Sequence, residues 1–140
     1  MSRRLEDLHP DVAVMARTLL AACEVDGIDL LCTCTWRSHE EQAALYAQGR
    51  TAPGKIVTNA KPGQSSHNHT AGGRPASLAL DVVPLRNGKA VWNTTGADGQ
   101  LWKRVGELGE QAGLAWAGRW TRFKEYPHFE HPRAPELRGA

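Results

Sequence analysis

The first third of the chain alternates between helical and extended hydrophobic spacing. Apolar residues recur every three or four positions between Pro10 and Gly27, which predicts a packing helix that begins at the proline. The following run at 28–36, IDLLCTCTW, is rich in β-branched and apolar residues and predicts a central strand. Ser38 and Glu41 then form a capping-box pattern that predicts a short second helix.

The middle of the chain predicts a long loop and then a buried strand. Residues 50–74 are rich in Gly, Pro, Ser, Thr and Asn, and long loops of this kind in compact domains are often functional. In the strand that follows, Leu80 and Val82 alternate with Asp81, so Asp81 points to the opposite face. Asn87-Gly88 then predicts a type I′ hairpin with a returning strand.

The last third predicts one more helix and two short strands. Apolar positions recur at helical spacing over residues 100–112, and the strands are expected at 114–116 and 127–130. The fold class is therefore α+β, a single domain over residues 1–140 with a small, mainly antiparallel sheet and packing helices. We expect residues 131–140 to form a loose tail, and we expect no separate cell-wall-binding domain.

Composition and charge argue against nucleic-acid binding, a disulfide framework and membrane insertion. The chain has 17 Lys and Arg against 15 Asp and Glu, a net charge of +2, which is too mild to favour nucleic acid but compatible with a polyanionic cell wall. The three cysteines lie in apolar segments and indicate buried thiols rather than a disulfide framework. The N-terminus has no apolar region typical of a signal peptide or membrane anchor, so we expect synthesis in the cytoplasm and no membrane insertion.

The residues around the Asp81 strand favour a metal site. A carboxylate in an apolar strand needs a partner, and a cation held together with His67 or His69 compensates its charge. His128, in a second strand-like run, offers a third ligand. Two nitrogens and one oxygen leave an open position on zinc, as in catalytic zinc sites. The letters His67-Asn68-His69 also resemble a nuclease motif, but no dense basic patch accompanies them.

Several separated motifs occur in one order and carry a family resemblance. They are the HPD opening, TWRSHEEQAALYAQGRTAPGKIVT, the serine-x-histidine at Ser65 to His67, the ALDV around Asp81, GLAWAGRW and EYPHFE. With these motifs the chain resembles the zinc peptidases that cut bacterial peptidoglycan, namely the phage-endolysin L-alanyl-D-glutamate peptidases and their D-Ala-D-Ala carboxypeptidase relatives. The resemblance implies their hedgehog and D-Ala-D-Ala peptidase-like fold.

The resemblance also implies the roles of particular residues. It implies zinc held by His67, Asp81 and His128, with Glu125 as the catalytic base. The loop from His67 to Asp81 is longer than in many relatives, which leaves His69 as a competing ligand. Some relatives have aspartate in place of Glu125, which keeps the carboxylate. Glu130 is a weaker candidate for the base, because it lies on the same strand face as His128.

Three further residues are implied in substrate binding. Arg37 is expected to dock a substrate carboxylate, which its planar guanidinium matches in geometry. The alternative is a structural salt bridge between Arg37 and Glu40 or Glu41. Gln42 and Ser65 are expected beside Arg37 as binding residues.

The function implied is an L-alanyl-D-glutamate endopeptidase that acts as a phage endolysin in host lysis. The expected partner is the peptidoglycan stem peptide, and we expect a monomer that binds no nucleic acid. The alternatives are a D-Ala-D-Ala carboxypeptidase and a non-catalytic, zinc-stabilised binding module. The expected localisation is the host cytoplasm after synthesis, with action on the cell wall after release.

Overall fold

An antiparallel sheet organises the computed structural model, which describes residues 1–139. Its five strands follow the order β1-β4-β7-β6, and β5 pairs with the far end of β4. The strands are β1 (Asp29–Cys34), β4 (Ala79–Arg86), β5 (Lys89–Ala90), β6 (Ala115–Trp116) and β7 (His128–Glu130), and a separate pair is formed by β2 (Thr70–Ala71) and β3 (Arg74–Pro75). The α-helices are α1 (Pro10–Val25), α2 (His39–Ala47), α3 (Gly96–Gln111) and α4 (Ala134–Arg138), and the 3-10 helices are η1 (Leu5–Asp7), η2 (Ser66–Asn68) and η3 (Ala117–Arg119). Among these helices, none combines the length and apolar character needed to cross a membrane.

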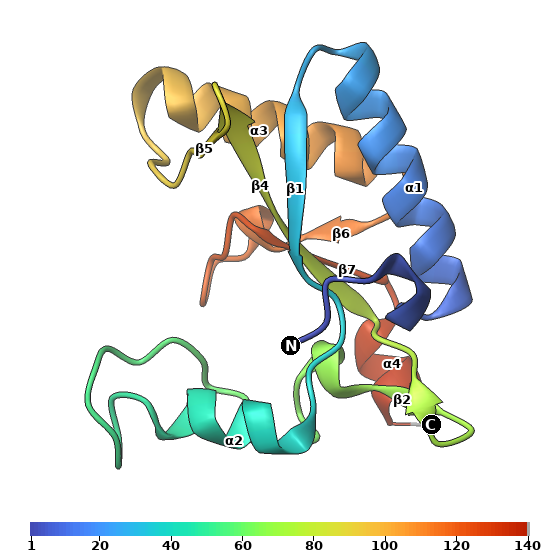
Figure 1. Ribbon diagram of the computed structural model, residues 1–140, viewed down its shortest axis with the longest axis vertical. Coiled ribbons are helices and arrows are strands. Elements are labelled where there is room, and N and C mark those ends of the chain that lie inside the picture. The colour runs from blue at the N-terminus through green and yellow to red at the C-terminus, as the bar shows by residue number, and fades with distance from the viewer. Residues whose placement is uncertain (140) are drawn as a thin grey trace.

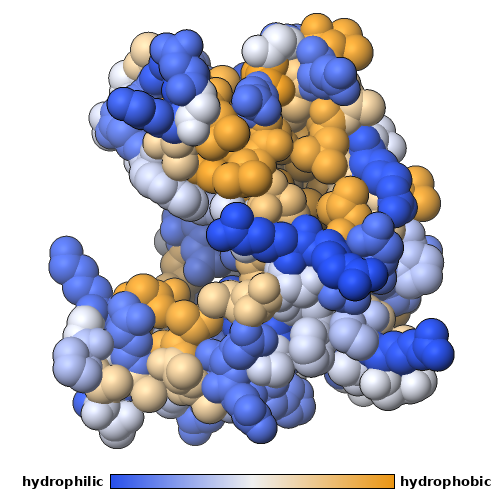
Figure 2. Space-filling view, viewed as in Figure 1, coloured by the Kyte–Doolittle hydropathy of each residue, from blue (hydrophilic) through white to orange (hydrophobic). Residues whose placement is uncertain are grey.

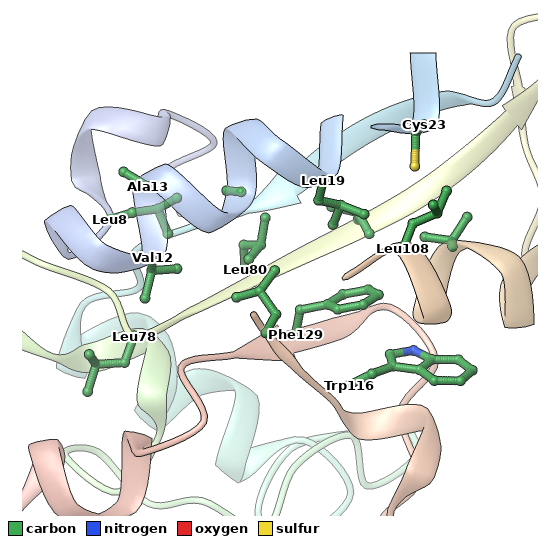
Figure 3. Close-up of a cluster of buried hydrophobic side chains, with 14 of the residues drawn as sticks. Leu8, Val12, Ala13, Leu19, Cys23, Leu78, Leu80, Leu108, Trp116 and Phe129 are labelled. Atoms are coloured by element: carbon green, nitrogen blue, oxygen red, sulfur yellow. The ribbon is translucent and has the colours of Figure 1, made fainter. Parts of the chain in front are cut away.

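The hydrophobic core lies between the sheet and helices α1 and α3 (Figure 1). Leu80 of β4 and Phe129 of β7 are fully buried and point toward side chains of α1 such as Leu19 (Figure 3). Helix α3 carries glycine where it crosses the sheet, so the helix and the sheet approach each other closely. A Cβ atom at Gly109 would lie 2.3 Å from the Phe129 ring, so a larger residue there requires the helix to move.

Local sequence signals are confirmed at several elements. The Ser38 side chain accepts from the Glu41 amide, and the Glu41 side chain accepts from the Ser38 amide, which completes the capping box of α2. Asn87 and Gly88 both have positive φ, at 53° and 76°, as a type I′ turn requires. Helix α3 begins at Gly96, earlier than its apolar spacing predicts.

Two predictions were wrong. The run at 28–36 was expected to be a central strand, but within residues 1–139 β1 pairs with β4 alone and lies at the edge of the sheet. Its apolar residues are explained by its contacts with α1 rather than by two strand neighbours. The expected loose tail instead contains α4, which has a proline in its first turn, and its Ala134 is fully buried.

Candidate metal centre

Strand pairing builds the centre of the site. Asp81 of β4 lies directly opposite His128 of β7 on one side and opposite Cys34 of β1 on the other. The register of β1 shifts between Cys32 and Cys34, where the ladder is irregular. Leu80 and Val82 belong to the core, so Asp81 points to the other face of the sheet, as its alternation predicts. The carboxylate is thus fixed by the backbone of three strands.

His67 comes to the same place from the long loop. It lies in η2, where Ser65 provides the N-cap and accepts from the His67 amide at 3.2 Å. The loop is tied to the end of β1, because the Arg37 amide donates to the His67 carbonyl at 3.0 Å. The buried His67 ring has Nδ1 2.8 Å from the Thr35 carbonyl and Nε2 3.3 Å from Asp81 Oδ1.

His128 faces the same carboxylate oxygen from the opposite side. Its Nδ1 lies 3.2 Å from Asp81 Oδ1, and its Nε2 lies 2.7 Å from Glu130 Oε1. The rings of His67 and His128 meet edge to face with their centroids 5.2 Å apart. Glu130 therefore occupies the side of the His128 ring that points away from Asp81.

These contacts fit a metal ion held by His67, Asp81 and His128. Nδ1 of His67 faces the Thr35 carbonyl and Nε2 of His128 faces the Glu130 carboxylate, both of which accept hydrogen bonds. The nitrogen that each ring can offer to a metal ion in place of its proton is therefore the one that faces Asp81. Zinc binds two such nitrogens and a carboxylate oxygen. Metal-binding histidines commonly have their other nitrogen held by a carbonyl or carboxylate in this way.

The electrostatics of the cluster agree with this reading. Burial lowers the pKa of His67, but the Asp81 carboxylate outweighs it and raises the pKa to about 10. Burial lowers the pKa of His128, but the contacts of the ring with Asp81 and Glu130 outweigh this effect and raise the pKa to about 9. Burial raises the pKa of Asp81, but the two histidines outweigh it and hold the pKa well below its usual range. Positive charge beside the Asp81 carboxylate therefore stabilises the cluster. Protons on the two histidines provide it in the metal-free protein, and a divalent cation provides it when bound.

Cys34 also adjoins the cluster. Its sulfur, a nitrogen of His67 and an oxygen of Asp81 lie within 4.8 Å of one another. However, Cys34 Sγ lies 3.7 Å from His67 Nδ1, the nitrogen that Thr35 already engages. It also lies 3.7 Å from Arg37 Nη2. We therefore favour His128 over Cys34 as the third ligand, because its free nitrogen faces Asp81.

Glu125 lies at the open side of the cluster. Its Oε2 is 3.9 Å from His128 Nδ1, and its side chain is 42% exposed, so the carboxylate reaches the cleft. Its amide donates to the Ala117 carbonyl, which anchors the segment before β7 to η3. Burial raises the pKa of Glu125 above its ordinary value, against the lowering effect of His128. A raised pKa suits a group that accepts and returns a proton.

Arg37 points into the site and is held there by Gln42 of α2. Its Nη2 lies 3.9 Å from Asp81 Oδ2, and its Nη1 donates to Gln42 Oε1 at 2.9 Å. The expected alternative, a salt bridge with Glu40 or Glu41, is not what this side chain makes among the described residues. Glu41 is instead held by its capping box and by the N-terminal ammonium.

Gln42 supports Arg37 from behind. It is fully buried, and its Nε2 donates to the Ala60 carbonyl at 2.8 Å, so both ends of its amide are engaged inside the protein. Direct contact between Gln42 and a substrate, as the sequence suggested, does not agree with this burial. Gln42 fixes the guanidinium of Arg37 and ties the loop at 60 to α2.

The proposed metal ligands lie in a cleft of about 750 Å³. Arg37, Ser65, Glu125 and the three proposed ligands all line it. The space-filling view shows the surface hollowed between the part that carries α2 and the rest of the molecule (Figure 2). Arg138 of α4 also lines the cleft and donates to the Gln64 carbonyl, so the segment expected to be a tail contributes to the site.

His69 lies away from the cluster. Its Nδ1 donates to the Ala76 carbonyl at 2.9 Å, and its ring lies 6.2 Å from that of His9 at the start of α1.

Glu130 makes a contact that its sequence position alone does not reveal. Its spacing of two from His128 did place it on the same strand face, but the structure makes it a hydrogen-bond partner of the ring.

Comparisons with known proteins identify the family of the chain. A family described as D-alanyl-D-alanine carboxypeptidase matches residues 58–131, which include the three proposed ligands and Glu125. The peptidoglycan L-alanyl-D-glutamate endopeptidase CwlK of Bacillus subtilis (strain 168) is 40% identical over 129 residues, 89% of this chain and 73% of CwlK.

Solved structures show the same fold at lower identity. The L-Ala D-Glu endopeptidase ChiX of Serratia marcescens has a TM-score of 0.66 at 18% identity, covering 95% of this chain and 86% of ChiX. The LD-carboxypeptidase LdcB also has a TM-score of 0.66 at 18% identity, covering 94% and 64%. A variant of the vancomycin resistance D,D-pentapeptidase VanY, in complex with Zn(II), has a TM-score of 0.60 at 14% identity, covering 95% and 79%. The chain therefore belongs to the D-alanyl-D-alanine carboxypeptidase family of peptidoglycan-cleaving metallopeptidases.

Proposed function

We propose that the chain is a zinc endopeptidase that cleaves the bond between L-alanine and D-glutamate in the peptidoglycan stem peptide. The observation that carries the proposal is the convergence of His67 Nε2 and His128 Nδ1 on Asp81, with Glu125 at the open side. The choice of bond is supported by the 40% identity to CwlK, a peptidoglycan L-alanyl-D-glutamate endopeptidase.

The three ligands and the base have separate roles in this proposal. Zinc held by His67, Asp81 and His128 would supply a Lewis acid for the peptide carbonyl and lower the pKa of water. Glu125 takes the proton from the attacking water and returns it to the leaving amine. Its partial exposure lets it reach a substrate in the cleft, and its raised pKa favours holding the proton between the two transfers.

Arg37 and Ser65 orient the substrate. The Arg37 side chain is held by Gln42 on one side, so its remaining N–H groups present a fixed charge to the cleft. D-Glutamate brings a carboxylate to the position after the scissile bond, and this group is the natural partner of Arg37. The Ser65 hydroxyl accepts from the His67 amide and retains its own hydrogen to donate to the substrate.

Digestion of purified peptidoglycan tests the bond that is cut. Mass spectrometry is expected to find glycan strands whose muramoyl groups carry a single L-alanine, and released peptides that begin with D-glutamate. A product that lacks only the terminal D-alanine identifies a D,D-carboxypeptidase instead. An absence of products at all enzyme concentrations leaves the non-catalytic binding module. A chelator is expected to abolish cleavage and added zinc to restore it.

We further propose that the activity serves phage-induced lysis, with the enzyme made in the host cytoplasm and acting on the wall after release. This rests on the order of motifs shared with phage endolysins. Expression in a bacterium is expected to cause lysis only when a pore-forming holin is also expressed. Lysis without a holin contradicts that route. Size-exclusion chromatography is expected to give a monomer.

A further inference from the structure

A second cavity, of about 320 Å³, opens from the same catalytic cluster. It shares Asp81, Glu125 and His128 with the main cleft. The rest of its wall is not shared with the main cleft and consists of Trp92, Thr94, Trp102, Lys124, Tyr126 and Pro127. A substrate that crosses the cluster between Glu125 and His128 therefore extends into two different surroundings.

Trp92 is the unusual member of this wall. It follows the β4-β5 hairpin and is 58% exposed, although tryptophan has a large apolar surface that is normally buried. Its backbone position is fixed, because the Val91 amide donates to the Pro84 carbonyl and the Val91 carbonyl accepts from the buried Trp102 ring. Nothing among the described residues covers its ring fully. An exposed aromatic ring that lines a cavity beside the proposed metal ligands is available to bind a ligand.

The charges of the two cavities assign the direction of the substrate. The main cleft carries Arg37 and Arg138, which suit the acidic D-glutamyl side of the scissile bond. The wall of the second cavity is mainly aromatic, and Thr94, Lys124 and the Tyr126 hydroxyl add hydrogen-bonding groups to it. The amino side of the scissile bond therefore lies against Trp92.

This assignment rests on the proposed function and identifies the group bound there. In peptidoglycan, the L-alanine before the scissile bond is joined by an amide to the lactyl group of N-acetylmuramic acid. The L-alanine residue spans about 3.5 Å and the lactyl group adds a comparable length, so the sugar lies within about two residue lengths of the scissile bond. Its ring is uncharged, with an apolar C–H face and hydroxyl and acetamido groups at its rim. We propose that the second cavity binds this N-acetylmuramoyl ring, with its C–H face stacked on Trp92.

A pair of substrates with the same peptide tests the proposal. One is N-acetylmuramoyl-L-alanyl-D-glutamyl peptide, and the other has a plain acetyl group in place of the muramoyl group. The zinc-loaded wild-type enzyme is expected to cleave the muramoyl substrate with a kcat/KM on the order of tenfold higher. Trp92→Ala is expected to lower kcat/KM for the muramoyl substrate about tenfold and to affect the acetyl substrate far less, so that the preference is lost, and Trp92→Tyr is expected to restore part of it.

Phe123 provides the matched control. It is also an exposed aromatic residue, 60% accessible, but it lines the main cleft only. Phe123→Ala is expected to leave the ratio of the two substrates unchanged. Equal losses on both substrates in Trp92→Ala, or no loss on either, overturn the inference while leaving the proposed function standing. A wild-type enzyme that cleaves neither substrate overturns the proposed function itself.

Discussion

Replacing Glu130 with alanine is expected to weaken zinc binding, because Glu130 holds the ring of a proposed ligand. Glu130 Oε1 accepts from His128 Nε2 at 2.7 Å, and both side chains are 10% exposed. A hydrogen bond to a charged group contributes about 1.5–3 kcal/mol. Loss of such a carboxylate typically costs about 10- to 100-fold in metal affinity, which is about 1.4–2.7 kcal/mol. The two ranges overlap, so we expect the zinc Kd of Glu130→Ala to rise about 10- to 100-fold.

The assay is a zinc titration against a competing chromophoric chelator at neutral pH, with circular dichroism to verify folding. Glu130→Gln keeps an oxygen acceptor and is expected to fall between wild type and alanine. Ser66→Ala is the control, since it removes only a 3.4 Å hydrogen bond to Glu130 and should leave the Kd near that of wild type. Unchanged zinc affinity with strongly reduced turnover in Glu130→Ala refutes the reasoning and makes Glu130, rather than Glu125, the candidate base.

The remaining predictions concern the base, the guanidinium, the ligand histidines and pH. Glu125→Gln should retain zinc by metal analysis and lose at least about 10²-fold in kcat; near-normal turnover would move the base elsewhere. Arg37→Lys should lower kcat/KM, because a point charge does not reproduce a planar fork, whereas a change in thermal stability alone would mark Arg37 as structural. His67→Ala should abolish zinc binding, while His69→Ala should keep stoichiometric zinc, and the reverse metal contents would contradict the assignment. In the metal-free protein, the raised pKa values of His67 and His128 stabilise the fold fully below about pH 6.5, and this stability should fall as pH rises through about 9 to about 10. Thermal melts in chelator across that range measure it, and a melting temperature that rises over the range would show the sign to be wrong.

Local patterns were sufficient to predict most of the larger elements, although not α4, because the causes of those elements are local. The alternation around Asp81 gives its face without any knowledge of the neighbouring strands. The capping box at Ser38 and the turn at Asn87 depend only on residues a few positions away. The place of β1 at the edge of the sheet depends instead on pairings far apart in sequence, and an apolar run covered by a helix looks the same as a central strand.

The candidate site likewise combines features that the sequence reveals with features that only the folded structure reveals. The residue types and order of His67, Asp81 and His128 are visible in the sequence, but the roles of their supports are not. Glu130 has the right spacing for His128, yet only the ring orientation distinguishes a hydrogen-bond partner from a base. Gln42 lies on α2, and its burial behind Arg37 follows from how that helix sits against the loop at 60.

The long loop between His67 and Asp81 is held by backbone hydrogen bonds at both ends, so its length does not disturb the site. The Leu78 amide donates to the Ser66 carbonyl, and the Ala76 amide donates to the His69 carbonyl, so the two ends of the loop lie side by side. The residues between them form the short β2-β3 pair, whose strand residues are mostly exposed. Extra length is thus taken up beyond the pinned ends, where lengthening a loop costs little free energy. His69 is turned toward the Ala76 carbonyl at the base of the hairpin, whereas His67 is held beside the end of β1 by Arg37 and Thr35. The same backbone contacts that absorb the longer loop therefore favour His67 as the ligand.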